Sequence, residues 1–198
     1  GAQTPLALVE KIEQQLYPRI VQDPIDNTDY WNQYYQNKIC STEPSPFAKY
    51  VSTLVDAGKT MVDLGCGNGR DTIYFAGRGM KMTAIDLSDS AIYILKQQSI
   101  PNTEFICADF VNQPDPHGNG YDYAYSRFTI HSINQTQERI LLRSIFGALR
   151  HGGKFFIEVR SIHDPLFGRG EALERNAFFY DNHYRRFIVL DELKTGLQ

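Results

Sequence analysis

The chain has 198 residues and a formal net charge of −3 at pH 7, from 20 Lys and Arg against 23 Asp and Glu. This length suits one domain with a full hydrophobic core. The charge gives no reason to expect a nucleic-acid or membrane-surface partner. No apolar run reaches the roughly 18 residues that a membrane span needs, and we find no signal-peptide pattern. Cys40, Cys66 and Cys107 lack metal-ligand spacing, so we expect no metal site and a reduced, cytoplasmic setting.

The first 27 residues are predicted to form an N-terminal helix and a linker. Apolar side chains recur at helical spacing over Pro5–Tyr17. Thr28 can cap a second helix that ends at Asn37 and is rich in aromatic residues. Ser45-Pro46 is a strong start for a third helix over Phe47–Leu54. We therefore divide the chain into residues 1–27 and a main domain over residues 28–198, with 28–37 as an aromatic helix.

Strands and helices then alternate along the chain. Short apolar strands are expected at Thr60–Leu64, Lys81–Ile85, Glu104–Cys107, Tyr121–Ser126 and Lys154–Arg160, and helices at Arg70–Gly77, Ser88–Gln98 and Gln135–Arg150. Gly152-Gly153 is expected to break the last of these helices. The alternation predicts an α/β, Rossmann-like doubly wound fold, with a mostly parallel sheet that helices cover on both faces.

Both ends of the chain look cut. It begins with Gly1 rather than Met, and it stops soon after Tyr184–Ile188, within a helix-like segment over Leu190–Leu197. We interpret it as a C-terminally truncated domain of a longer polypeptide with flanking domains. The alternative is that only a flexible tail is missing.

Polar features follow three consecutive strands of the predicted sheet. The first strand runs into a glycine-rich turn at Asp63–Gly69 and then into a helix. Glycines let the backbone approach a ligand closely, and the free N–H groups of the helix suit a carboxylate or phosphate. Asp86 ends the second strand and Asp109 follows the third. Parallel strands share one carboxyl edge, where open sheets bind their ligands, so these features predict a nucleotide-type site.

The segment Val62–Gly69 resembles motif I of the class I S-adenosylmethionine-dependent methyltransferases, D/E-x-G-x-G-x-G, and the chain is similar to their small-molecule branch, including the tellurite-resistance-type enzymes. The resemblance implies S-adenosylmethionine as cofactor and a sheet order of 3-2-1-4-5-7-6, of which we cannot find the last two strands. It assigns cofactor binding to Asp63, Gly65, Cys66, Gly67, Asn68, Gly69, Arg70, Asp86, Leu87, Asp109, Phe110 and Ser126, and to Tyr30 and Trp31 of the aromatic helix.

A dinucleotide is the alternative cofactor. Dinucleotide sites favour G-x-G-x-x-G, in which the third glycine lets helix and strand pack closely. Here the third glycine, Gly69, comes one place early, and Arg70 is too large for that packing role. The sequence therefore favours S-adenosylmethionine.

Methyl transfer needs alignment and exclusion of water more than charge stabilisation. The aromatic helix can supply a lid, because aromatic faces stabilise a cationic sulfur. Tyr34 and Tyr35 are then expected beside the acceptor. The alternative is that these aromatic residues are ordinary core.

The loop after the fourth strand carries the candidate catalytic residues, Arg127 and His131. His131 can accept the proton of the nucleophile, or it can be a structural histidine. Arg127 can orient the substrate or brace the loop.

Arginines are frequent after the fifth strand. Arg160, Tyr184, Arg185 and Arg186 are candidate substrate-binding residues, because arginine holds anions bidentately. Acidic residues are interleaved with them, so a solvated loop of ion pairs is the alternative. We therefore expect methyl transfer to a small anionic acceptor, with oxygen favoured as the nucleophile. A non-catalytic module that binds cofactor or a partner within a larger protein is the second hypothesis.

Overall fold

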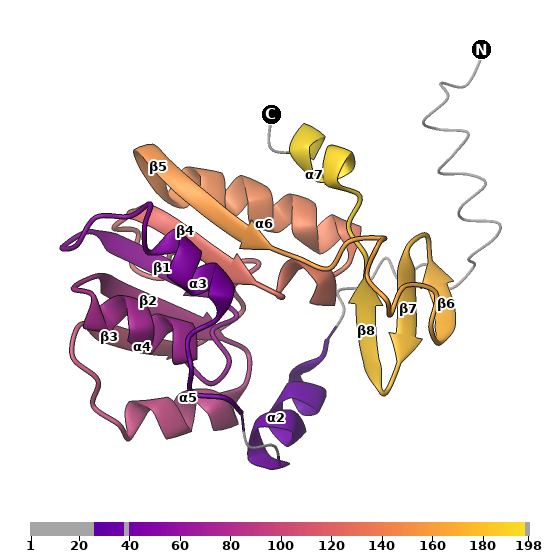
Figure 1. Cartoon of the computed structure of the whole chain (residues 1–198), viewed down its shortest axis with the longest axis horizontal. Helices are drawn as coiled ribbons and strands as arrows, with labels where there is room; N and C mark the ends of the chain where they lie inside the picture. The colour runs from indigo at the N-terminus through magenta and orange to yellow at the C-terminus, as the bar shows by residue number, and fades with distance from the viewer. Residues whose placement is uncertain (1–25, 38–39, 197–198) are drawn as a thin grey trace.

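The computed structural model describes residues 26–37 and 40–196. The helix expected over Pro5–Tyr17 lies outside the described residues. The described chain forms a five-stranded sheet with a three-stranded sheet beside it (Figure 1). The strands of the large sheet are β1 (Thr60–Leu64), β2 (Lys81–Asp86), β3 (Thr103–Cys107), β4 (Tyr121–Arg127) and β5 (Leu149–Glu158). The helices around it are α2 (Thr28–Asn37), α3 (Pro46–Val51), α4 (Arg70–Gly77), α5 (Asp89–Lys96) and α6 (Gln135–Ala148), with a short 3₁₀ helix η1 (Ile130–Ser132).

The large sheet is parallel throughout, in the order β3-β2-β1-β4-β5. This confirms the predicted α/β fold and reproduces the first five positions of the expected strand order. Leu64 pairs with Ile85 on one side and with Ser126 on the other. The central strands therefore end together, which brings the segments that follow them to one edge. Within the described residues the large sheet has no sixth or seventh strand.

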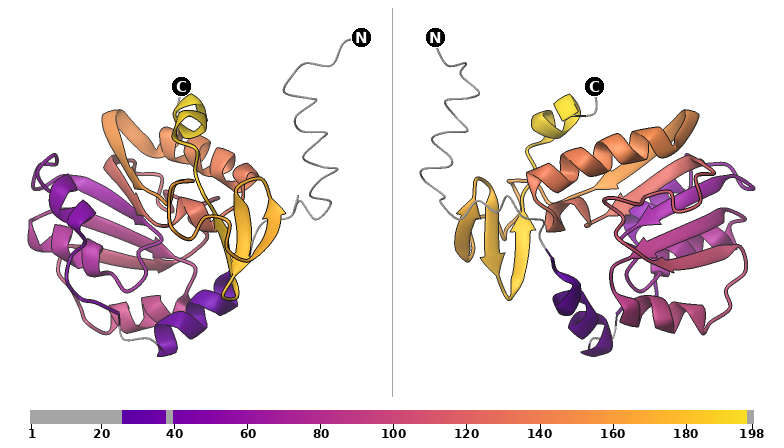
Figure 2. Two further views of the ribbon diagram at one scale, coloured as in Figure 1. Left: turned by 45° about the vertical axis from the view of Figure 1, so that its right-hand side comes forward. Right: turned by 180° about the vertical axis from the view of Figure 1, so that it is seen from behind.

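Helices cover both faces of the large sheet (Figure 2). In β1, Met61 packs with α3 and α4 on one face, while Val62 and Leu64 pack with α6 on the other. Burying such a side chain contributes about 1.5–3 kcal/mol. All three side chains are fully buried, so β1 is the centre of the core.

The boundary between α6 and β5 differs from the prediction. The helix was expected to continue to Arg150 and the strand to begin at Lys154, but α6 ends at Ala148 and β5 begins at Leu149. Gly152 has a φ of +77°, and the pairing of β4 with β5 shifts its register at this end. The glycines therefore permit an irregularity inside a strand instead of breaking a helix.

The three-stranded sheet was not predicted. It comprises β6 (Glu171–Glu174), β7 (Ala177–Tyr180) and β8 (His183–Arg186), all antiparallel. Asn176, Asp181 and Asn182 have positive φ in its two tight turns, as hairpin turns of this kind require. Asp181-Asn182 was a recognisable signal for the second turn.

The end of the chain returns to the large sheet. A bridge pairs Ser161 with Ile188, and α7 (Leu190–Gly196) places Leu193 in the core beside α6. Within the described residues every helix is too short or too polar to span a bilayer.

Candidate cofactor and acceptor site

The glycine loop joins β1 to α4 at the carboxyl edge of the large sheet. Gly65, Gly67 and Gly69 have φ values of +75°, +56° and +74°. A Cβ on Gly65 would lie 2.5 Å from Oγ1 of Thr129, and one on Gly67 would lie 2.2 Å from the hydroxyl of Tyr35. Glycine is required here both by the backbone conformation and by the close approach of neighbouring side chains.

Asp86 ties the glycine loop to the end of β2. Its Oδ2 accepts a hydrogen bond from the backbone N–H of Gly67 at 2.8 Å, and its Oδ1 accepts one from the N–H of Ser88, also at 2.8 Å. Burial raises the pKa of this carboxyl, while the two N–H donors act in the opposite direction. The acid therefore has a defined orientation at the edge of the pocket.

Asp63 lies at the same edge, inside the core. Its carboxylate accepts a hydrogen bond from the hydroxyl of Thr72 at 2.6 Å. Burial raises its pKa to about 7. Asp109, after β3, accepts from the N–H of Val111 at 2.8 Å. All three expected acids are thus at the strand ends, and each has partners within the protein.

The aromatic helix α2 lies across this edge. Its side chains make hydrogen bonds to α5: Asn32 accepts from the hydroxyl of Ser88 at 2.7 Å, and Gln36 donates to Ser90 at 2.9 Å. No residue of α2 is buried. Helix α2 is therefore joined to α5 by polar contacts and is not part of the hydrophobic core.

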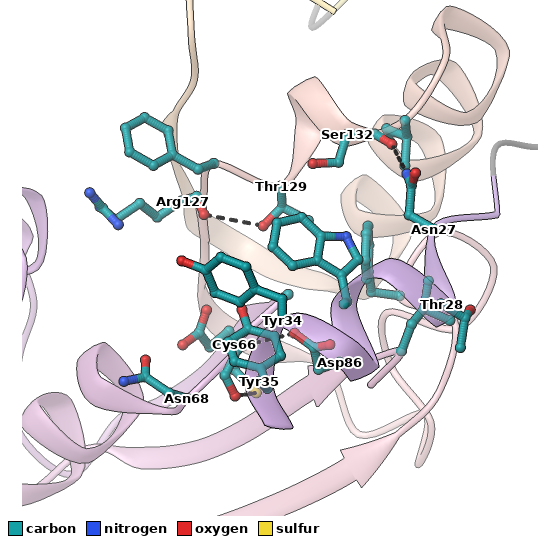
Figure 3. A pocket seen from close by; sticks show the side chains of 18 of the residues that line it. Asn27, Thr28, Tyr34, Tyr35, Cys66, Asn68, Asp86, Arg127, Thr129 and Ser132 are labelled. Carbon is teal, nitrogen blue, oxygen red and sulfur yellow. Dashed lines mark hydrogen bonds between the residues drawn. The ribbon is translucent and has the colours of Figure 1, made fainter. Parts of the chain in front are cut away.

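A cavity of about 570 Å³ lies between α2 and the strand ends (Figure 3). Of the predicted residues, those that line it are Trp31, Tyr34, Tyr35, Asp63, Gly65, Cys66, Gly67, Asn68, Arg70, Asp86, Leu87, Asp109, Phe110 and Arg127. The sequence analysis missed other lining residues, which are Asp26, Asn27, Thr28, Cys40, Ser41, Asp71, Val111, Tyr125, Phe128, Thr129, Ser132, Ile133 and Gln137. Most of these come from loops and from the ends of helices, where no local pattern marks them.

Several predicted site residues do not line the cavity. Ser126 is fully buried within β4, and Gly69 faces Leu95 of α5. Tyr30 turns away and stacks on His183, with ring centroids 4.6 Å apart. His131 lies behind the cavity wall, 4% exposed.

Cations and rings gather at the ends of β4 and β5 and in the segments that follow these strands. Arg127 forms an ion pair with Glu158 at 2.6 Å, and its guanidinium lies 4.2 Å from the ring centroid of Phe128. The guanidinium of Arg160 lies 4.9 Å from the same ring. Phe128 has a φ of +57°, a conformation that costs on the order of 1–2 kcal/mol outside glycine. Such strain is typical of a functional loop.

The predicted substrate residues of β8 have partners within the protein. The hydroxyl of Tyr184 donates to Glu174, and Arg185 donates to the carbonyl of Tyr180 at 2.6 Å. Arg186 forms a buried ion pair with Glu138 of α6. Their placement therefore does not support the predicted contact with substrate, because these groups brace the small sheet.

Comparison with known proteins places this geometry in a class. A family model described as "Methyltransferase domain" matches residues 61–153. The chain has the fold of a TehB-like S-adenosylmethionine-dependent methyltransferase from Corynebacterium glutamicum, with a TM-score of 0.56, 16% identity, and coverage of 85% of this chain and 77% of that one.

Two curated relatives are similar in sequence. Trans-aconitate 2-methyltransferase of Deinococcus radiodurans is 30% identical over 154 residues, which are 75% of this chain and 56% of the relative. Phosphoethanolamine N-methyltransferase 1 of Triticum aestivum is 32% identical over 114 residues, 54% of this chain and 22% of the relative. The chain thus spans about half of one relative and less of the other.

Residues 61–153 match the methyltransferase domain family, and the chain is similar to class I S-adenosylmethionine-dependent methyltransferases, a tellurite-resistance-type (TehB-like) one among them. A glycopeptide N-methyltransferase with the same fold, 19% identical and with a TM-score of 0.51, is described in complex with S-adenosylmethionine, the cofactor that the glycine spacing favours over a dinucleotide.

Proposed function

We propose that this protein transfers a methyl group from S-adenosylmethionine to a small acceptor that carries an anionic group, with oxygen favoured as the nucleophile. The observation that carries the proposal is one continuous cavity with two different sides. Asp86 and the glycine loop line one side, and Arg127 with the Phe128 ring lines the other. Donor and acceptor would therefore meet inside a single pocket.

The residues present fit the cofactor. Asp86, at the end of β2, is suited to ribose hydroxyls, and the glycine loop leaves room for a close backbone approach. S-adenosylmethionine supplies the electrophilic methyl group on a sulfonium. Trp31, Tyr34 and Tyr35 would cover it, exclude water and present aromatic faces to the cationic sulfur. In this proposal α2 is a lid on a domain that spans residues 28–198.

The anionic character of the acceptor is supported by the cations at the far side of the cavity. Arg127 lines it, and Arg160 lies on the same aromatic ring. Arg127 pairs with Glu158 and Arg160 with Asp164, and Arg160 keeps an unpaired Nε–H. The two relatives are named for trans-aconitate and phosphoethanolamine, and both compounds carry acidic groups. Since one relative is named as an N-methyltransferase, the assay has to include amine acceptors too.

His131 is proposed as the proton acceptor and Arg127 as an orienting group. Burial lowers the pKa of His131 well below its usual value, and Arg160 lowers it further. A neutral imidazole can accept a proton, and a bound anion would offset the nearby cations and raise its basicity.

The test has two stages. Calorimetry first measures the binding of S-adenosylhomocysteine, with NAD as the control ligand. Methyl transfer from labelled S-adenosylmethionine is then measured on trans-aconitate, phosphoethanolamine and their neutral esters or amines. Transfer to the acids supports the proposal. Binding of S-adenosylhomocysteine without transfer to any acceptor would favour the non-catalytic module, and transfer to neutral acceptors alone would remove the anionic class.

A further inference from the structure

Most buried side-chain polar atoms without hydrogen-bond partners in the described residues lie around the carboxyl end of β4, whereas Asp115 Oδ1 lies elsewhere, and Arg127 Nε faces Glu158 Oε2 in an ion pair. Those around β4 include the hydroxyls of Ser126 and Ser132, Nδ1 of His131, both ring nitrogens of His183 and Nε of Arg160. The two serines and two histidines are at most 6% exposed. Native proteins pair nearly all such groups, so a group of unpaired ones calls for a ligand or ordered water.

These atoms lie where three elements meet. The rings of His131, in η1, and His183, in β8, are 6.4 Å apart and nearly perpendicular. The lid helix covers His183, with Tyr30 stacked on its face and the Trp31 ring centroid 5.0 Å away. Ser132 and Trp31 also line the cofactor cavity. The unpaired group is therefore the layer directly behind the cavity wall.

In Figure 3, Ser132 lies beside Asn27 and Thr129, whereas Asp86 lies beside Cys66 and Tyr35. Asp86 and the glycine loop form the cofactor side. The unpaired atoms consequently belong to the side left for the acceptor.

Donors predominate among the unpaired groups. Two serine hydroxyls, the Nε–H of Arg160 and one N–H on each neutral imidazole can donate. Burial, together with the nearby Arg185 and Arg160, lowers the pKa of His183 to about 3. Both histidines are thus neutral and can donate, and Arg160 beside them leaves its Nε–H unpaired while its Nη1 pairs with Asp164, which suits the oxygens of an anion.

We propose that Ser132, His131 and His183, together with Arg160, form the subsite that binds the oxyanion group of the methyl acceptor beneath the lid helix. This rests on the proposed function, because it names the part of that site that selects the acceptor. His183 is the new element, and it comes from the small sheet. Since Tyr30 stacks on it and α2 has no buried residue, the lid has to move for the anion to reach His183.

Trp31 is the single tryptophan of the chain, so its fluorescence reports on this subsite. Protein saturated with S-adenosylhomocysteine, as shown by calorimetry, is titrated with malonate and with inorganic phosphate. Malonamide is the neutral control. We expect a saturable change with malonate or phosphate and none with malonamide, and the stronger of the two anions identifies a carboxylate or a phosphate site.

Variants locate the effect. His183→Phe keeps a ring against Tyr30 and removes both nitrogens, and Ser132→Ala removes one hydroxyl. Each should weaken anion binding about tenfold, because a hydrogen bond to a charged group is lost. Affinity for S-adenosylhomocysteine should be retained. His117→Phe is the matched control, since His117 is exposed and pairs only with Glu104.

The outcomes separate the two proposals. If the unaltered protein does not bind S-adenosylhomocysteine, the proposed function is refuted. The anion titration is then repeated in the absence of S-adenosylhomocysteine. The subsite is overturned if neither anion changes the fluorescence, if malonamide acts equally, or if Ser132→Ala and His183→Phe bind the anion as the unaltered protein does. If His183→Phe does not fold, Ser132→Ala decides.

Discussion

The two sides of the cavity differ in how their polar groups are satisfied. On the proposed cofactor side, Asp86 accepts hydrogen bonds from the N–H groups of Gly67 and Ser88, and Asp63 accepts one from the hydroxyl of Thr72. On the acceptor side, His131 and His183 are buried with unpaired nitrogens. The polar groups of the first side have their hydrogen-bond partners within the protein. Those of the second side are left for a ligand to hydrogen-bond.

This difference suggests that one side positions the cofactor and that the other selects the acceptor. A site whose hydrogen bonds are already formed is rigid and preorganised, and it binds one cofactor. A site that leaves buried donors unpaired penalises any ligand that cannot pair them, so it discriminates strongly. We expect substitutions on the first side to change cofactor affinity, and substitutions on the second to change the choice of acceptor.

The largest effect is expected at the ion pair that supports the acceptor side. Arg186→Ala leaves Glu138 buried without its partner, which should lower the free energy of unfolding by about 3–5 kcal/mol. Denaturant unfolding measures it. The control is Arg185→Ala, which removes a contact with a backbone carbonyl at the surface and should cost about 0.5 kcal/mol or less. A stable Arg186→Ala protein that binds the acceptor poorly would return Arg186 to the substrate site.

Asp86 should have the next largest effect. Asp86→Ala removes a carboxylate whose hydrogen bonds to ribose are worth about 1.5–3 kcal/mol each, so affinity for S-adenosylhomocysteine should fall at least about tenfold. Calorimetry measures the affinity, and circular dichroism shows that the fold survives. Asp89→Ala, at the start of α5, is the control. Unchanged affinity in a folded Asp86→Ala protein would remove Asp86 from the cofactor site.

Gly67→Ala tests the contact between the lid and the glycine loop. The new Cβ would lie 2.2 Å from the Tyr35 hydroxyl, at a φ of +56°. Backbone strain alone is about 1–2 kcal/mol, which corresponds to about a tenfold loss of cofactor affinity. Gly147→Ala, in α6 with open space around it, should leave the affinity unchanged. Equal affinities in the two variants would show that the loop tolerates a side chain.

The smallest effect is a pH dependence that Asp63 produces. Its pKa is about 7 in the folded protein, against 3.8 for an unperturbed Asp. Between these values the folded state binds more protons than the unfolded chain. The contribution of Asp63 to stability is therefore complete below pH 3.8 and falls as pH rises towards 7. The slope is at most about 1.4 kcal/mol per pH unit. Asp63→Asn should flatten it in unfolding titrations, and an unchanged slope would contradict this.

The sequence predicted the cofactor side because its determinants are local. Gly65 and Gly67 must be glycine wherever the turn is formed, and the acid at the end of β2 follows from the strand pattern alone. The strands also followed from short apolar runs, since the side chains of a doubly covered sheet are buried on both faces. The small sheet was missed because β6 and β7 are only four residues each, and half of β6 is glutamate.

The roles of the arginines could not be predicted from their spacing. Arg186 pairs with Glu138, 48 residues away, so a side chain that looked free to bind an anion is neutralised within the protein. His183 meets His131 and Tyr30 only after β8 has packed against η1 and α2. The sequence by itself determined the fold class and the acids at the strand ends, and it predicted the cofactor, because backbone conformation and strand order depend on neighbouring residues. Tertiary structure alone decided which charged and polar side chains are paired and which remain available, because their partners come from distant parts of the chain.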